Sequence, residues 1–162
     1  METEHVMHTF APVYDKKSRV LILGTFPSVK SRENRFYYGH PRNRFWEVTA
    51  AVCGCEVPET IEEKKAFLLE NRIAIWDVIA SCDIAGSSDS SITNVVANDI
   101  ERLLTEAPIE AVFLNGAKAY ELFMKYCSCK DKAEICKLPS TSPANAAWSL
   151  ERLIEEWKKI RR

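Results

Sequence analysis

The sequence is poor in glycine and has no long apolar run, and both absences restrict its architecture. Only 5 of its 162 residues are glycine, and no Gly/Ser-rich linker, internal repeat or low-complexity segment divides it. No stretch of 18 apolar residues is present, so we expect no segment to cross a membrane. Chains of this length commonly form one compact domain, which predicts a single domain over residues 1–162.

The charge balance lacks an excess of either sign. With 22 Lys and Arg against 23 Asp and Glu, the net charge is −1, so any binding to nucleic acid must depend on a local basic patch. The acidic start of the chain, Met-Glu-Thr-Glu-His, is unlike the basic start of a secretory signal peptide. We therefore expect a cytoplasmic protein, with residues 1–15 loosely ordered.

The six cysteines lack the spacing of a metal or cluster site. They form two C-x-C pairs and two single residues: Cys53 with Cys55, Cys127 with Cys129, Cys82 and Cys136. Zinc and iron–sulfur sites usually need longer and repeated spacings, and no histidine lies at ligand spacing here. Disulfides are rare in chains that are not exported. We expect reduced structural thiols, no metal and no cofactor, with a metal or cluster site as the minor alternative.

Short apolar runs alternate with segments of helical pattern. Four runs are typical of buried strands, namely residues 19–24, 73–78, 111–115 and 134–138. Helices are expected over residues 44–53, 60–71, 95–106, 118–126 and 148–160, with Asn94 as the cap of the third. This alternation predicts an α/β fold, a three-layer α/β/α domain with a short, mainly parallel four-stranded sheet.

In such a sheet the ligand crevice lies beyond the carboxyl ends of the strands. The segments that leave those ends are residues 24–28, 77–78, 115–116 and 139–145. We expect these four segments to converge on the functional site.

The loop after the first predicted strand is locally basic. Residues 30–44 contain five basic side chains and one acid, which gives a local charge of about +4: Lys30, Arg32, Arg35, Arg42, Arg44 and Glu33. Aromatic residues lie between and after them, namely Phe36, Tyr37, Tyr38, Phe45 and Trp46. Basic groups attract phosphates and flat rings stack on bases. The alternative is a solvated loop whose rings fill the core, and we favour that alternative for Phe45 and Trp46.

Residues 138–145 form an uncharged loop with two prolines. Such a stiff, narrow segment can approach a DNA backbone closely, although composition alone favours an ordinary turn before the last helix.

The sequence contains no G-x-S-x-G, H-E-x-x-H, P-loop or G-x-G-x-x-G motif. His40 is the one candidate functional histidine, because His5 and His8 lie in the segment expected to be loose.

Taken together, these residues resemble the uracil-DNA glycosylase superfamily over residues 19–160. The turn Gly24-Thr25-Phe26-Pro27-Ser28 is similar to its first motif, and Tyr38-Gly39-His40-Pro41-Arg42-Asn43-Arg44-Phe45-Trp46 is similar to the F-A-H-P-x-N-R-F-W stretch of mismatch-specific uracil glycosylases. Residues 138–145, with residues 149–153, resemble the second motif and the helix that follows it, and residues 111–120 resemble the third strand.

One departure from that pattern selects a branch of the family. The mismatch-specific enzymes have Asn, and the classical enzymes Asp, where this chain has Phe26, which forms no hydrogen bond. The pattern resembles the hypoxanthine-DNA glycosylase branch, in which the catalytic amide moves to the position of Asn43. The resemblance implies a monofunctional DNA glycosylase that flips a deaminated base out of DNA and leaves an abasic site.

The resemblance also implies site residues and partners. The catalytic residue is Asn43. The implied substrate-binding residues are Gly24, Thr25, Phe26, Pro27, Ser28, Tyr38, Asp77 and Asn115. The implied DNA-binding residues are Arg42, Arg44, Ser140, Ser142, Pro143, Ala144 and Asn145. For Asp77 and Asn115, pinning of loops is the competing interpretation. The partner is double-stranded or single-stranded DNA, with no membrane, and a monomer is expected. A uracil or mismatch-specific glycosylase, an enzyme of free nucleosides and a non-catalytic DNA-binding relative remain the alternatives.

Overall fold

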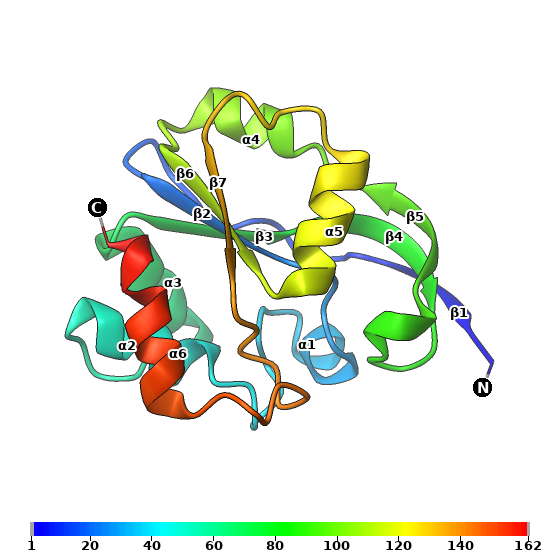
Figure 1. Cartoon of the computed structure of the whole chain (residues 1–162), viewed down its shortest axis with the longest axis horizontal. Coiled ribbons are helices and arrows are strands. Elements are labelled where there is room, and N and C mark those ends of the chain that lie inside the picture. Colours follow the sequence, from blue (N-terminus) through cyan, green and yellow to red (C-terminus); the bar gives the residue numbers. More distant parts are fainter. Residues whose placement is uncertain (1, 162) are drawn as a thin grey trace.

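A four-stranded parallel sheet lies at the centre of the computed structural model, which describes residues 2–161 (Figure 1). Its strands, in spatial order, are β3 (Ile73–Asp77), β2 (Val20–Gly24), β6 (Ala111–Asn115) and β7 (Glu134–Leu138). Each strand matches a predicted apolar run to within one residue at either end. In β2 and β6 every residue is buried, as expected for a parallel sheet that is covered on both faces.

Alternate residues of the strands point to opposite faces of the sheet and build two halves of the core. Val20 and Ile22 face a layer made by α2 (Phe45–Cys53), α3 (Ile61–Glu70) and α6 (Leu150–Trp157), which continues as a short 3-10 turn, η2 (Lys158–Ile160). Leu21 and Leu23 face α4 (Ile100–Glu106) and α5 (Ala117–Tyr126). Figure 1 shows the two helical layers on either side of the sheet. The predicted three-layer α/β/α architecture is confirmed.

A second sheet was not expected from the sequence. It is antiparallel, with the order β1 (Glu4–Met7), β4 (Ile79–Ile84) and β5 (Thr93–Ala97). Strand β4 begins two residues after β3 ends, so the chain passes directly from one sheet into the other across Val78. A 3-10 turn, η1 (Asp89–Ser91), lies between β4 and β5.

The helix predicted over residues 95–106 is wrong in its first half. Residues Thr93–Ala97 form strand β5, because β-branched residues such as Val95 and Val96 favour extended backbone. Val96 pairs with Ser81 of β4, and register shifts interrupt the pairing on either side of Ser81. The helix α4 begins at Ile100 and is capped by the side chain of Asp99, not by Asn94. Asn94 adopts a left-handed backbone conformation with φ 54°.

The N-terminal segment is ordered, whereas residues 1–15 were expected to be loose. Met1 lies outside the described residues. Strand β1 pairs with β4 over its whole length, and the His8 amide donates to the Ala80 carbonyl at 2.7 Å. Val13 forms a bridge with Ile75 at the edge of the parallel sheet and is buried. Pairing with two strands that lie far along the chain orders this segment, and no local pattern could report it.

A short helix, α1 (Val29–Asn34), interrupts the long loop after β2 and was also missed. Ser28 caps it by accepting a hydrogen bond from the Ser31 amide. In Figure 1, α1, the segment before α2 and the segment after β7 lie together at one edge of the molecule. Over residues 2–161, none of the helices has the length and apolar character needed to cross a bilayer.

Candidate active site

A cavity of about 340 Å³ opens where the four predicted segments meet. Its volume falls in the range of about 300–1,000 Å³ that is typical of small-molecule sites. Of the predicted site residues, the structure brings together at this cavity Gly24, Thr25, Phe26, Pro27, Ser28, Tyr38, Asn43, Asp77, Asn115, Ser140, Ser142, Pro143 and Ala144. Arg42, Arg44 and Asn145 lie outside its lining. The convergence follows from the parallel sheet, which places its carboxyl strand ends at one edge.

Three side chains from three segments form a buried hydrogen-bond relay along one wall. The Asn115 amide, at the end of β6, donates from Nδ2 to Thr141 Oγ1 at 3.0 Å, and its Oδ1 accepts from the Thr141 backbone amide at 3.0 Å. The Thr141 hydroxyl then donates to Asn43 Oδ1 at 2.8 Å. Thr141 is fully buried, so nothing in solvent competes for these bonds.

The relay fixes which way the Asn43 amide faces. Its Oδ1 accepts from Thr141 and from the Phe45 backbone amide at 3.0 Å, just at the start of α2. Because a backbone N–H can only donate, this contact assigns the oxygen of Asn43 without ambiguity. Both lone pairs of the oxygen are then in use. Within residues 2–161, Nδ2 has no hydrogen-bond partner, so the site presents an N–H donor to the cavity.

The opposite wall carries a carboxylate. Asp77, the last residue of β3, is only 4% exposed, and its Oδ2 lies 2.8 Å from His8 Nε2. His8 was expected to lie in a loose terminus, but its side chain is 3% exposed and packs among the rings of Phe10, Phe26 and Tyr37. The aromatic packing holds the imidazole in place and aims it at the carboxylate.

The competing interpretation for Asp77 was that its side chain holds a loop in place. In the structure, Asn98 holds the turn after β3 instead. The Asn98 side chain donates from Nδ2 to the carbonyls of Asp77 and Ile79, at 2.9 and 3.2 Å. The Val78 amide also donates to the Gly24 carbonyl at 2.9 Å. The turn from β3 into β4 is therefore held through main-chain atoms, and the carboxylate of Asp77 is not needed for it. Asn115, in contrast, does pin the loop after β7 through Thr141.

Gly24 is the point at which the two walls meet. A Cβ atom at this position would lie 2.5 Å from Asp77 Oδ1 and 3.0 Å from the hydroxyl oxygen of Tyr38, closer than real Cβ contacts allow. Only glycine leaves room for both groups. Tyr38 itself adopts a left-handed backbone conformation with φ 51°, which turns its ring into the site.

The Tyr38 ring stacks on Phe45, with centroids 3.9 Å apart, so one face of the ring is already covered. Stacking of Tyr38 on a base stays a prediction and would use the other face of the ring. Burial and the Asp77 carboxylate raise the pKa of the Tyr38 hydroxyl, and the Asn115 amide counteracts part of this rise. Phe26 is half-buried and lines the cavity as an apolar surface, with the Arg32 guanidinium 5.8 Å from its ring centre.

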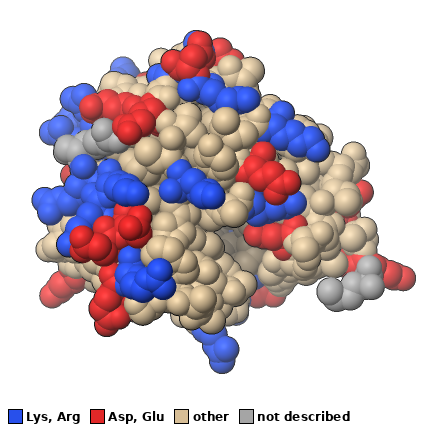
Figure 2. All heavy atoms as spheres, in the orientation of Figure 1, with Lys and Arg blue, Asp and Glu red and all other residues tan. Residues whose placement is uncertain are grey.

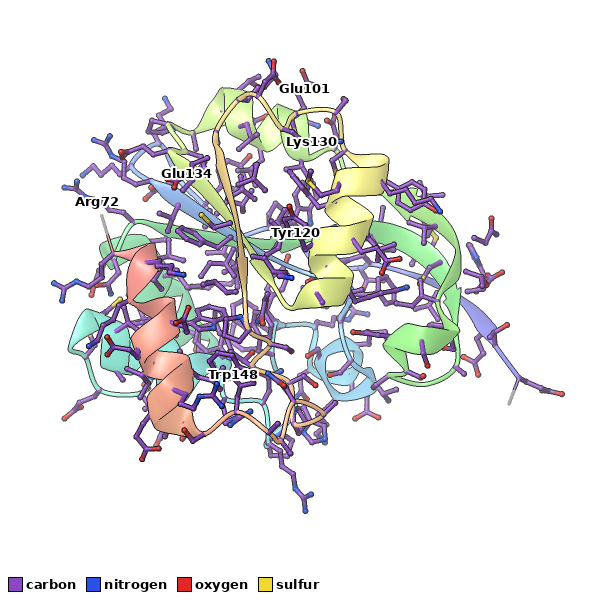
Figure 3. The ribbon with its side chains drawn as sticks, in the orientation of Figure 1. Arg72, Glu101, Tyr120, Lys130, Glu134 and Trp148 are labelled. Atoms are coloured by element: carbon purple, nitrogen blue, oxygen red, sulfur yellow. The ribbon has the colours of Figure 1, made fainter. Side chains whose placement is uncertain are left out.

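Arg44 makes its contacts in this structure within the protein, and the DNA contact predicted for it stays a prediction. Its guanidinium donates to the carbonyls of Trp148 and Asn145, at 2.5 and 3.0 Å, and its backbone amide donates to the Thr141 carbonyl. Arg44 therefore clamps the loop after β7 against the start of α2. Trp148, at the lower end of α6 in Figure 3, lies under the Arg152 guanidinium at 4.1 Å. Phe45 and Trp46 are buried, which confirms their expected place in the core.

Few of the basic side chains in the first loop remain available for phosphates. Lys30 pairs with Glu33, and Arg32 donates to the Gly86 carbonyl. Over the part of the chain that the structure describes, Arg35 and Arg42 are exposed and their guanidinium groups have no protein partner. Figure 2 shows charges of both signs mixed across the visible face, in line with the net charge of −1.

Sequence reasoning missed three residues that shape this site, namely His8, Asn98 and Thr141. For Thr141 a signal existed, since it lies inside the predicted loop between Ser140 and Ser142. For His8 and Asn98 the only signal was the second sheet, which the sequence pattern did not reveal. His40, the histidine favoured by the sequence, lines the cavity and accepts from the Arg42 backbone amide at 3.0 Å through Nδ1.

The cysteines lie away from the cavity lining, and Cys53, Cys55, Cys82, Cys127 and Cys129 are free thiols. Burial raises the pKa of the Cys53, Cys82 and Cys127 thiols to about 11. Within residues 2–161, no three His, Cys, Asp or Glu side chains are grouped so as to hold a metal ion.

Comparison with known proteins identifies the family of this chain. Residues 11–161 match the model of the uracil DNA glycosylase superfamily, and the chain belongs to that superfamily. It is 35% identical over 155 residues to a protein named hypoxanthine DNA glycosylase from Methanosarcina acetivorans, covering 93% of this chain and 95% of that protein. A hypoxanthine DNA glycosylase from Methanosarcina barkeri is 32% identical over 114 residues, 69% of this chain and 72% of that protein.

A solved structure gives the same assignment for the fold. The solution NMR structure of a protein from Methanosarcina acetivorans, described as a candidate uracil DNA glycosylase, superposes with a TM-score of 0.79. Its sequence is 34% identical, and the match covers 93% of both chains.

Proposed function

We propose that this protein is a monofunctional DNA glycosylase that releases hypoxanthine from DNA and leaves an abasic site. The observation that carries the proposal is the Asn43 amide, which is fixed by the relay and presents its free N–H donor to the cavity. It supplies a polar group where Phe26 cannot. The 35% identity to a hypoxanthine DNA glycosylase over nearly the whole chain supports hypoxanthine as the base.

The damaged nucleotide must leave the stacked duplex before its glycosidic bond is accessible. Flipping costs a few kcal/mol and is easiest for a mispaired base, which favours deaminated bases over normal ones. The cavity accepts the flipped base between the Asn43 wall and the Asp77 wall, with Phe26 as an apolar surface. The uncharged loop after β7, held rigid by Arg44, contacts the DNA strand at the mouth of the cavity.

The chemistry is a dissociative cleavage of the bond between the sugar and the base. Positive charge develops on the sugar and negative charge on the departing base; water then adds to C1′ of the sugar cation, and its proton goes to the released base or to solvent. The Asn43 N–H donates to the departing base, and because both lone pairs of Oδ1 are in use, this donor role takes precedence over activation of water. The cavity lining includes no lysine, so no Schiff base forms with the sugar and the product is an abasic site.

The test is a set of duplexes that each carry one damaged base, treated with alkali after incubation to reveal abasic sites. We expect hypoxanthine to be released, and uracil, xanthine and ethenocytosine to be released more slowly or not at all. Release of uracil in preference to hypoxanthine would identify a uracil glycosylase instead. Binding of all duplexes without release of any base would identify a non-catalytic relative, and equal cleavage of free inosine would identify an enzyme of nucleosides.

We further propose that the protein acts as a monomer in the cytoplasm, as one domain over residues 1–162, in base excision repair. Exposed Arg35 and Arg42 provide the phosphate contacts beside the cavity. A local contact of this kind suits a chain with a net charge of −1, which cannot grip DNA through its overall field.

A further inference from the structure

A second carboxylate lines the cavity in addition to Asp77. Among the described residues, the lining contains two acidic side chains, Asp77 and Asp89, and neither lysine nor arginine. Asp77 is 4% exposed and lies 2.8 Å from His8 at the end of β3. Asp89 belongs to η1, between β4 and β5, and is exposed to solvent. One acid therefore lies deep in the cavity and the other lies at its mouth.

The turn that carries Asp89 is fixed in place. Ser91 Oγ donates to the Ser88 carbonyl at 2.7 Å, which closes the turn on itself. Ser87 Oγ accepts from the Val29 amide, at the start of α1, at 2.9 Å. These contacts attach the turn to α1, and Figure 1 shows it, in green, at the same edge of the molecule. A charge on such a turn has a defined position beside the cavity.

The side chain of Asp89 does not hold the turn together. Over residues 2–161 its carboxylate has no hydrogen bond or ion pair, and only its backbone carbonyl is used, by the Ile92 amide. Partial burial raises the pKa of the Asp89 carboxyl, nearby Lys118 lowers it, and the charge of Asp77 raises it. Lys118 forms its own ion pair with Glu121, at 4.0 Å. The structure thus keeps an unpaired anion that faces the same space as Asp77.

The position of Asp89 decides which part of a flipped nucleotide it meets. The base enters the cavity deepest, whereas the sugar stays attached to the DNA backbone at the mouth. When the bond between C1′ and the base nitrogen breaks, the electron pair leaves with the base and the sugar becomes a cation. A carboxylate at the mouth therefore lies on the side of the sugar, while the Asn43 N–H meets the departing base.

We propose that ionised Asp89 stabilises the sugar cation in the transition state of base release. This inference rests on the proposed function. Asp89 forms no bond and takes up no proton, because water adds to C1′ and its proton goes to the released base or to solvent. Phe26 offers no polar group in the first loop, so the negative charge comes from a turn of the second sheet. A charge that is already in position need not reorganise during the reaction.

The test measures the affinity of the protein for two duplexes that carry no base at the target position. One has a pyrrolidine ring in place of the sugar, whose protonated nitrogen mimics the cation, and the other has a neutral tetrahydrofuran ring. The wild-type protein should bind the cationic duplex more tightly. Asp89→Asn keeps the shape of the side chain and removes its charge, so we expect the ratio of the two affinities to fall by about tenfold. Affinity for the neutral duplex should be retained or rise, because one charge that repels phosphates is gone.

Two further variants separate Asp89 from the other acids. Asp83→Asn is the matched control, because Asp83 pairs with His5 at 2.9 Å on the surface of the second sheet, outside the cavity lining. Its affinity ratio should equal that of the wild-type protein. Asp77→Asn tests the deep carboxylate and should change the ratio less than Asp89→Asn does. In single-turnover assays on a hypoxanthine duplex, Asp89→Asn should slow base release by about tenfold, with the melting temperature unchanged.

An unchanged affinity ratio in Asp89→Asn overturns the proposal. A larger fall of the ratio in Asp77→Asn also overturns it, because the deep carboxylate would then stabilise the cation. Equal losses of affinity for both duplexes, together with a lower melting temperature, would assign Asp89 to the structure of the turn and reject the proposal as well. A wild-type protein that releases no base from any duplex contradicts the proposed function alone, since the affinity ratio is measured without base release.

Discussion

The Thr141 hydroxyl donates to the Asn43 amide oxygen at 2.8 Å and joins residues that lie far apart in the sequence. Asn43 precedes α2, and Thr141 lies in the loop after β7. Their contact is completed by Asn115 at the end of β6, so one hydrogen-bond relay spans the two strands on one side of the cavity. The orientation of the predicted catalytic amide is thus set by a residue that does not itself need to touch the base.

This relay predicts a difference between two substitutions of Thr141. Thr141→Val removes the hydroxyl at almost constant volume, leaves the Asn115 donor unpaired and should destabilise the protein by about 1–3 kcal/mol. We expect base release to slow by about tenfold or more while DNA affinity is retained, because the Asn43 amide loses an orienting partner. Thr141→Ser keeps the hydroxyl and should retain most of the activity. Single-turnover rates with thermal unfolding curves measure both effects, and equal rates for the two variants would contradict the positioning role.

Asn43 has two separable contributions, one to folding and one to chemistry. Asn43→Ala should lower base release by about 100- to 1,000-fold and cost about 1 kcal/mol of stability, because its oxygen also accepts from the Phe45 amide at the start of α2. Asn43→Asp keeps that acceptor and removes the N–H donor. It should therefore unfold close to the wild-type temperature and still be inactive near neutral pH. Wild-type rates in either variant would remove Asn43 from the catalytic role.

Two arginines two residues apart should respond in opposite ways to truncation. Arg42→Ala should weaken DNA binding with thermal stability unchanged. The slope of log affinity against log salt concentration should become less steep by about one, because about one ion fewer is released on binding. Arg44→Ala should lower stability, because its guanidinium holds the carbonyls of Asn145 and Trp148. Binding isotherms across a salt series, paired with unfolding curves, separate the two. An unchanged salt slope in Arg42→Ala would exclude a phosphate contact.

Gly24→Ala should impair the site through a single added methyl group. The new Cβ would meet Asp77 Oδ1 at 2.5 Å and the Tyr38 hydroxyl oxygen at 3.0 Å, so one of the two must move. Overpacking of this kind costs about 1–3 kcal/mol. We expect loss of activity larger than the loss of stability explains. Gly54→Ala serves as a control for stability alone, since a Cβ there has nothing within 4 Å and only its φ of 68° is strained.

Thiol reagents should leave the activity intact. Burial raises the pKa of Cys53, Cys82 and Cys127 to about 11, so the reactive thiolate of each is scarce near neutral pH and becomes abundant only at higher pH. Cys55 is exposed and should be alkylated first. Mass spectrometry after iodoacetamide treatment at pH 7 gives the order of modification. Inactivation that keeps pace with the first alkylation would show that a thiol takes part in function.

The parallel sheet was predictable because its strands carry local signals. Each strand is a short, almost continuous apolar run, and burial on both faces of a covered sheet demands that pattern. The loops that meet at the cavity followed from the same prediction, since parallel strands end at one edge. The resemblance to a known family then singled out Asn43 within those loops.

The remaining features depend on contacts between distant segments. Strand β1 is mostly exposed and mixes polar with apolar residues, and it is ordered by pairing with β4. No periodicity in residues 1–15 reports that pairing, so His8 was assigned to a loose terminus. Arg44 belongs to a basic stretch whose composition suggests DNA binding, but the two carbonyls that it holds lie in a loop about a hundred residues later.

The position of β1 has a consequence for how the protein matures. During synthesis this strand emerges long before its partner β4, and Asp77 is made only just before that partner. The carboxylate wall is therefore assembled only after β4 has been made. A bulky fusion placed directly before residue 4 would hinder the pairing of β1 with β4. The same fusion placed after residue 162 would not affect this pairing.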